Sequence, residues 1–182
     1  MLYEELEEEV EMRVKLFKAM MGYYVTDKFT EWLVRKGFFT APASKKYHVA
    51  YPGGLFDHCY LVAKVLQDLT KNNKLEWEEA RSPLIVGMFH DLCKIDLYVE
   101  DEEVGKYTYS DAMMMGGHGD KSVIYLSEHM RLTNEEIMCI RWHMGAFDEK
   151  ENWKFYSGGV RKYPNVLWTH TADMIASQIM GV

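Results

Sequence analysis

A histidine and an aspartate stand side by side in the most apolar stretch of this sequence, the segment LIVGMFHDLCKI at residues 84–95. A segment this apolar is expected to be buried when the chain folds. Burying a charged carboxylate without a partner is costly, so Asp91 requires a cation nearby. Lys94 is one candidate, three residues further along the helix, and a metal ion held by Asp91 together with His90 is another. The folded chain therefore has to place a cation beside the carboxylate of Asp91.

Apolar residues recur at helical spacing through most of the chain. Thr26 is placed to cap one helix, and Ser82, followed by a proline, to open another. We therefore predict an all-α helical bundle in one domain over residues 1–182, with about seven helices and one small β-hairpin at Leu97–Tyr109. The expected helices are Leu2–Met21, Thr26–Arg35, Leu55–Thr70, Ser82–Ile95, His118–Met130, residues 134–145 after a cap at Thr133 or Asn134, and Asn165–Met180, with loops expected at Phe38–Gly54 and residues 146–164.

Composition limits the partners and the compartment. The acidic first ten residues do not resemble a signal peptide, and no apolar run approaches the ~20 residues of a membrane helix, so we expect a cytoplasmic protein that does not enter membranes. The net charge of −7, from 21 basic and 28 acidic residues, disfavours long nucleic acid as a partner and favours a small anionic substrate. Three cysteines without CxxC spacing predict neither a disulfide framework nor a cysteine-only zinc site.

Six residues are candidate metal ligands. Imidazole nitrogens suit divalent transition metals, and a carboxylate can bridge two ions with its two oxygens. Adjacent residues on a helix point about 100° apart, so a His-Asp pair can offer one ligand to each of two neighbouring sites. Each residue alone is weak evidence, since a single helix histidine is more often structural. The candidates are His58, His90, Asp91, His118, His143 and Asp173.

Three motifs together resemble the HD superfamily of metal-dependent phosphohydrolases. GGLFDH at residues 53–58 is similar to the start of that family's first ligand helix, and HTADMIAS at residues 170–177 to its last. FHDLCKI at residues 89–95 is similar to the HDxGK signature, with Cys93 where glycine is usual. The resemblance covers residues 47–176.

The resemblance implies an HD-type helical domain that binds one or two divalent ions, with Mn, Fe, Ni, Zn and Mg all open. His58, His90, Asp91 and Asp173 would hold the first ion. His118 and His143 would hold a second that Asp91 bridges, although Met144 stands where some two-metal members have another histidine. The implied activity is hydrolysis of a phosphomonoester or phosphodiester, with a nucleotide as the expected substrate. Asp91 and Lys94 would be the catalytic residues, and Lys94 would also contact phosphate.

Two further segments bear on the substrate. Residues 41–58 are similar to the loop that leads into the HD domain of certain 3′–5′ exoribonucleases, yet this chain lacks room for their OB-fold domain. His48 in this loop is a candidate phosphate contact or a solvated histidine. Residues 153–163 (WKFYSGGVRKY) combine aromatic side chains with Arg161 and Lys162 around two glycines, which suits a nucleotide-binding flap or a packed surface loop.

Two other functions fit the same residues. Some HD-fold proteins use a di-iron centre for oxygen chemistry, and a non-catalytic module could bind a nucleotide through the same pocket. The acidic N-terminal helix is a candidate homodimer contact, or it packs on its own domain.

Overall fold

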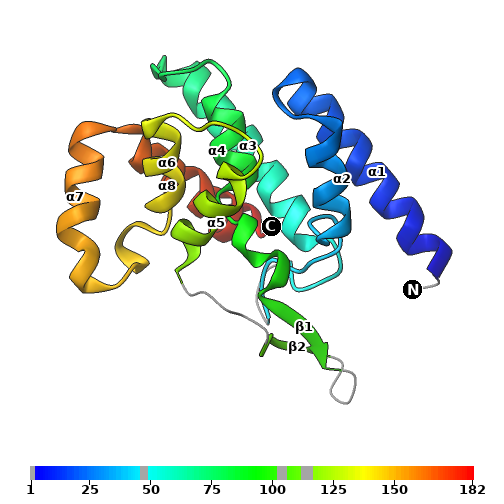
Figure 1. The fold of residues 1–182 in the computed structure, drawn as a ribbon. Helices are drawn as coiled ribbons and strands as arrows, with labels where there is room; N and C mark the ends of the chain where they lie inside the picture. Colours follow the sequence, from blue (N-terminus) through cyan, green and yellow to red (C-terminus); the bar gives the residue numbers. More distant parts are fainter. Residues whose placement is uncertain (1–2, 46–48, 102–105, 112–116) are drawn as a thin grey trace. The chain divides into compact units, whose positions relative to one another are not determined.

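The computed structural model describes residues 3–45, 49–101, 106–111 and 117–182. Within them the protein is all-α: it is 68% helical, with eight α-helices and one two-stranded antiparallel sheet (Figure 1). The fold class predicted from the sequence is confirmed. None of the described helices combines the length and apolarity needed to cross a membrane.

The chain divides into two compact units. The first comprises Met1–His58 and Lys94–Met113, and the second Cys59–Cys93 and Met114–Val182. The helix α3 (Gly54–Asn73) begins in the first unit and continues in the second. The expectation of a single domain stays a prediction.

The first unit contains two of the predicted helices and the predicted hairpin. Thr26 caps its helix as expected, because its side chain accepts a hydrogen bond from the Phe29 N–H at 3.2 Å. The strands pair antiparallel, with Tyr98 opposite Tyr109. The elements are α1 (Tyr3–Met21), a 3₁₀ turn at Gly22–Tyr24, α2 (Asp27–Arg35), β1 (Tyr98–Asp101) and β2 (Lys106–Tyr109).

An aromatic core and an ion pair between α1 and the start of α3 stabilise the first unit. Phe17, Phe38, Phe39 and Phe56 are buried, and their rings meet mostly edge to face with centroids 5.2–6.4 Å apart. The Arg13 guanidinium on α1 donates two hydrogen bonds, of 3.0 and 3.1 Å, to the carboxylate of Asp57 in the first turn of α3. This bidentate pair fixes the start of the helix that carries His58.

The second unit contains the remaining helices. Helix α6 packs against α4, α5 and α8, and α4 also packs against α8 (Figure 1). Every residue of α4 is buried, as its apolar sequence predicts. The elements are α4 (Ser82–Phe89), a 3₁₀ helix at Leu92–Asp96, α5 (His118–Ser127), α6 (Asn134–Arg141), 3₁₀ turns at Gly145–Phe147 and Lys150–Asn152, α7 (Trp153–Lys162), α8 (Asn165–Met174) and a π-helical continuation at Ile175–Met180.

Buried glutamates connect these helices. Thr133 caps α6 in a capping box, in which the fully buried Glu136 carboxylate accepts from the Thr133 N–H at 2.8 Å. The same carboxylate accepts from the Ser82 hydroxyl at 3.1 Å and lies 3.3 Å from the Arg81 guanidinium. Glu135 accepts a 2.8 Å hydrogen bond from the Asn165 amide on α8. The start of α6 is thereby tied to the starts of α4 and α8.

The predicted helix Ser82–Ile95 is wrong in two respects. It ends at Phe89, and the chain turns at His90 and Asp91 before the 3₁₀ helix begins. The Cys93 N–H, which would bond to Phe89 in a continuing α-helix, donates instead to the Ser122 hydroxyl at 3.0 Å. Ser82 is also not the cap: Arg81 precedes the helix, and the Ser82 hydroxyl serves Glu136.

Two boundaries near the C-terminus also differ from the predictions. Helix α6 ends at Arg141 rather than at residue 145. The expected loop over residues 146–164 contains the ten-residue helix α7. Gly159, interpreted from the sequence as part of a flexible pair, is buried against Trp142, whose indole would lie 3.1 Å from any Cβ at that position. The glycine therefore permits close packing of α7 against Trp142, and a role of this segment as a nucleotide-binding flap stays a prediction.

Candidate metal centre

Two histidines of the second unit follow the ends of neighbouring helices and are anchored in the same way. His90 directly follows α4, and its Nδ1 lies 2.9 Å from the carbonyl oxygen of Gly87. His143 lies two residues beyond α6, and its Nδ1 lies 2.7 Å from the carbonyl oxygen of Ile140. A carbonyl can only accept, so each Nδ1 carries the proton. The Nε2 of each neutral ring then bears the lone pair that a metal ion requires.

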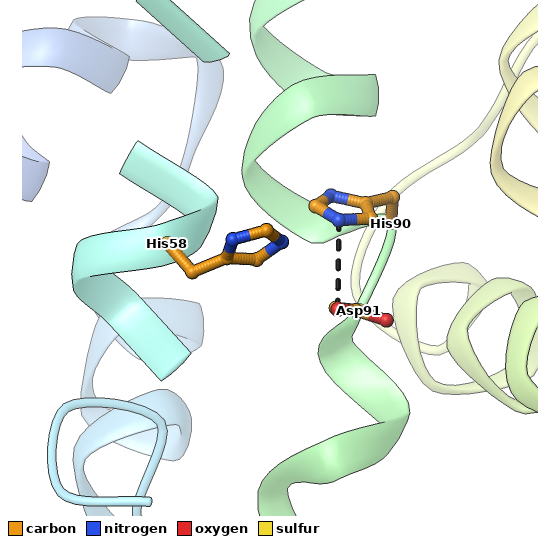
Figure 2. Close-up of side chains that lie close together, drawn as sticks. All are labelled: His58, His90 and Asp91. Carbon is orange, nitrogen blue, oxygen red and sulfur yellow. Dashed lines mark ion pairs between the residues drawn. The ribbon is translucent and has the colours of Figure 1, made fainter. Parts of the chain in front are cut away.

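Asp91 faces both of these Nε2 atoms. Its Oδ2 lies 3.6 Å from Nε2 of His90, the pair marked in Figure 2, and its Oδ1 lies 3.4 Å from Nε2 of His143. The side chains of all three residues are buried, with at most 4% of their surface exposed. A carboxylate with one oxygen directed at each of two imidazoles has the geometry of a bridging ligand.

Asp173 on α8 completes this cluster. It is 7% exposed, and one ligand atom each from His90, His143 and Asp173 lie within 4.8 Å of one another. The buried Nε2 of His143 has a carboxylate oxygen of Asp91, 3.4 Å away, as its polar neighbour. Two imidazoles and two carboxylates form a donor set that divalent transition metals favour. The residues present therefore fit a metal ion.

The electrostatic environment of His143 also favours a bound cation. Burial acts to lower the pKa of this imidazole, but the hydrogen bond and negative charge of Asp91, with the charge of Asp173, act in the opposite direction and raise it overall. The buried carboxylates thus create a local environment that favours positive charge. A divalent ion would satisfy that environment more fully than a proton.

A second group of ligand atoms lies beside the first and contains a residue that the sequence reasoning did not propose. Asp91, Cys93 and His118 each offer one ligand atom, again within 4.8 Å of one another. His118 is the first residue of α5, as predicted. The one sequence signal for Cys93 is its departure from the motif, a thiol at a position where glycine is usual.

Two residues that are not candidate ligands help to position those that are. His170 on α8 donates from Nδ1 to the backbone carbonyl of His143 at 2.7 Å, so it helps to position a candidate ligand. Gly119, next to His118, lies so close to α6 that any Cβ there would sit 2.2 Å from the carbonyl oxygen of Arg141. The glycine beside His118 is thus required for α5 to approach α6.

The other predicted site residues belong to the first unit, lie on α7 or fall outside the described residues. His58 projects from the first turn of α3 (Figure 2) and is 4% exposed, but it belongs to the first unit. Lys94, half-buried in the 3₁₀ helix, also belongs to the first unit. Arg161 and Lys162 are exposed on α7, and His48 lies outside the described residues. The roles expected of these five residues stay predictions.

Two cavities of the second unit are lined by predicted site residues, and a third, of about 700 Å³ beside Arg81 and Thr133, is not. One, of about 430 Å³, is lined by His118 together with Arg141, Asp120, Asp148 and other residues. The other, of about 590 Å³, is lined by Lys162 with Trp142, Phe155, Tyr163 and further residues, and none of the candidate metal ligands contributes to it. Of these three cavities, the one at His118 is lined by a candidate metal ligand.

Comparison of the chain with protein-family models, curated proteins and solved structures finds no match.

Proposed function

We propose that this protein is a metal-dependent phosphohydrolase that cleaves a phosphomonoester or phosphodiester, with a nucleotide as its substrate. The observation that carries the proposal is the position of Asp91, which directs one carboxylate oxygen toward His90 and the other toward His143. The resemblance of the three sequence motifs to HD phosphohydrolases supports the choice of reaction. Asp173 and His118 supply the further ligands of one or two ions.

The protein's own residues hold and shield the centre. A bound divalent ion would supply an activated water and polarise the phosphoryl oxygens. Asp91 and Asp173 stay ionised beside that positive charge, and the Nδ1 hydrogen bonds of His90 and His143 keep both rings in the ligating tautomer. Because the candidate ligands are buried, bulk water reaches the centre from the side on which the 430 Å³ cavity opens.

The charges of that cavity favour a small substrate. Among the residues lining it, Arg141 is the cation, whereas Asp120, Asp148 and Glu149 are acids. Arg141 is already ion-paired with Asp120 at 2.6 Å and with Asp148 at 2.7 Å. Phosphate charge is therefore neutralised chiefly by the metal ions, and a long polyanion is disfavoured. Phosphate contacts from Lys94, Arg161, Lys162 and His48 remain part of the proposal through the sequence alone.

The decisive experiment compares two aspartate variants. Wild type, Asp91→Asn and Asp68→Asn are purified, their metal content is measured by elemental analysis, and each is assayed with a generic phosphoester and a nucleotide panel in added Mn²⁺. Asp68 is exposed on α3, so its variant removes the same charge away from the centre. Circular dichroism checks that all three proteins are folded.

We expect wild type and Asp68→Asn to bind metal and hydrolyse a phosphoester, and Asp91→Asn to lose both properties. Retention of both properties by folded Asp91→Asn would overturn the proposal. Absence of any hydrolysis by metal-loaded wild type would overturn it as well, and an iron-dependent visible spectrum would then direct attention to oxygen chemistry.

A further inference from the structure

The thiol of Cys93 lies directly against the imidazole of His118. Its Sγ is 3.2 Å from Nδ1, and a carboxylate oxygen of Asp91 completes a group whose atoms lie within 4.8 Å of one another. Cys93 and Asp91 are 2% and 3% exposed, and His118 is half-buried at the cavity. We propose that Cys93 is itself a metal ligand, and that Cys93, Asp91 and His118 form a zinc site. This inference deepens the proposed function and rests on it for the shared ligand Asp91.

Helix α5 positions both Cys93 and His118. His118 and Ser122 are four residues apart on α5 and so lie on the same face. The Ser122 hydroxyl, fully buried, accepts the backbone N–H of Cys93 at 3.0 Å. One face of α5 therefore carries both contacts. Ser122 holds the backbone of Cys93, and His118 places its imidazole beside the Cys93 thiol. The thiol–imidazole approach is built into the packing.

The spacing of the atoms suits tetrahedral zinc. With Zn–N bonds of about 2.0 Å and Zn–S bonds of about 2.3 Å, ligand atoms lie roughly 3.3–3.8 Å apart. The separation of 3.2 Å between Sγ of Cys93 and Nδ1 of His118 is close to that range. Three protein ligands leave the fourth position for water or substrate, as in catalytic zinc sites, and the cavity at His118 supplies the opening.

The thiolate also narrows the choice of metal. Sulfur is a soft ligand that selects zinc over magnesium or manganese, whose preferred ligands are oxygens. The neighbouring cluster of His90, His143 and Asp173 contains only nitrogen and oxygen donors. The two halves of the centre are thus chemically different, with Asp91 between them.

The competing explanation is a simple hydrogen bond between the Cys93 thiol and His118, with no metal bound to sulfur. Cobalt distinguishes the two explanations, because Co²⁺ replaces Zn²⁺ and a thiolate bound to it gives a charge-transfer band in the near ultraviolet. The protein is freed of metal with a chelator and titrated with Co²⁺, and Zn²⁺ affinity is then measured by competition. The proteins compared are wild type, Cys93→Ala and Cys139→Ala, the last removing another buried thiol.

We expect the charge-transfer band in wild type and Cys139→Ala but not in Cys93→Ala. Zinc affinity should fall at least about 10-fold in Cys93→Ala, because loss of a ligand should cost no less than loss of a supporting contact. A wild-type cobalt complex without the band would overturn the inference, as would unchanged zinc affinity in folded Cys93→Ala. If that variant does not fold, Cys93→Ser, which keeps the size of the side chain but removes the sulfur, replaces it in both measurements with the same expected results.

Failure of this inference and failure of the proposed function give different results. Hydrolysis without the sulfur–cobalt band would leave the phosphohydrolase proposal standing and remove Cys93 from the metal site. The band without hydrolysis of any phosphoester would establish the cysteine ligand and remove the proposed reaction.

Discussion

The imidazole rings of His90 and His143 lie edge to face, with their centroids 4.9 Å apart and their planes at 76°. Each ring is fixed by a hydrogen bond from Nδ1 to the carbonyl three residues before it, at the end of its own helix. Helix ends leave their last carbonyls without partners, so these bonds satisfy the backbone and fix the tautomer together. Two buried rings this close cannot both be protonated cheaply, whereas one cation between them serves both.

Metal binding should therefore stabilise the fold. At a free metal concentration 100 times the dissociation constant, one site adds about 2.7 kcal/mol to the free energy of unfolding. For a chain of this size we expect the thermal midpoint to rise by about 5–10 °C. Scanning calorimetry of metal-free wild type with added Zn²⁺ or Mn²⁺ measures this rise. In His143→Ala the rise should shrink markedly, and an equal rise in both proteins would show that His143 binds no metal.

Gly145 and His170 should be energetically coupled. Gly145 has φ of +58°, and any Cβ there would lie 3.0–3.1 Å from the His170 ring. We expect Gly145→Ala to cost about 2 kcal/mol, from the left-handed backbone and from this contact. His170→Ala should cost about 1 kcal/mol, because its bond to the His143 carbonyl is lost. Since the smaller residue relieves the clash, urea unfolding of the double variant should show a loss below the sum of the single losses. Strict additivity would contradict the contact.

The capping box of α6 should contribute strongly to stability. Thr133→Ala removes the cap and should lower the free energy of unfolding by about 1 kcal/mol. Glu136→Ala should cost about 3 kcal/mol, because it leaves the Ser82 hydroxyl and the Arg81 guanidinium without their acceptor. Urea denaturation measures both losses, with the exposed Glu128→Ala expected to stay within about 0.5 kcal/mol of wild type. A Glu136 variant as mild as the Glu128 control would mean that this network is not formed in solution.

Features that depend on local chemistry were predicted well from the sequence. Thr26 and Thr133 begin their helices because a side-chain oxygen satisfies a backbone N–H a few residues away, and that relationship is visible in the sequence. The apolar stretch ending at His90 is buried for the same kind of local reason. The candidate ligands His90, Asp91, His143 and Asp173 were found through residue type and motif order, and the structure brings them together in the second unit.

Features that depend on contacts distant in sequence were missed. Helix α4 ends early because Ser122, 29 residues further on, accepts the N–H of Cys93. Helix α7 forms where a loop was predicted, and the side of Gly159 without a Cβ packs against Trp142. The approach of Cys93 to His118 likewise follows from how α5 packs, which residue patterns do not specify.

Asp148 gives a prediction about pH. Burial acts to raise the pKa of its carboxyl group, but hydrogen bonds from Asn152, Arg141 and the Glu149 N–H, with the charge of Arg141, lower it overall. The folded state therefore favours the ionised form more than the unfolded state does. The resulting stabilisation is complete above the unfolded pKa, near the usual 3.8, and is lost as the pH falls through the lower folded value.

The test of Asp148 is the stability difference between wild type and Asp148→Asn, measured by urea unfolding from pH 7 down to pH 2. The amide keeps the shape of the side chain but cannot pair with Arg141 as an ion, so we expect the variant to be less stable at neutral pH. This deficit should shrink below about pH 4, because the wild-type carboxyl group then becomes protonated too. Asp68→Asn removes an equal charge at an exposed position and corrects for the general effect of net charge. A deficit that stays constant down to pH 2 would show that loss of shape or packing, and not loss of the ionised carboxylate, destabilises the variant.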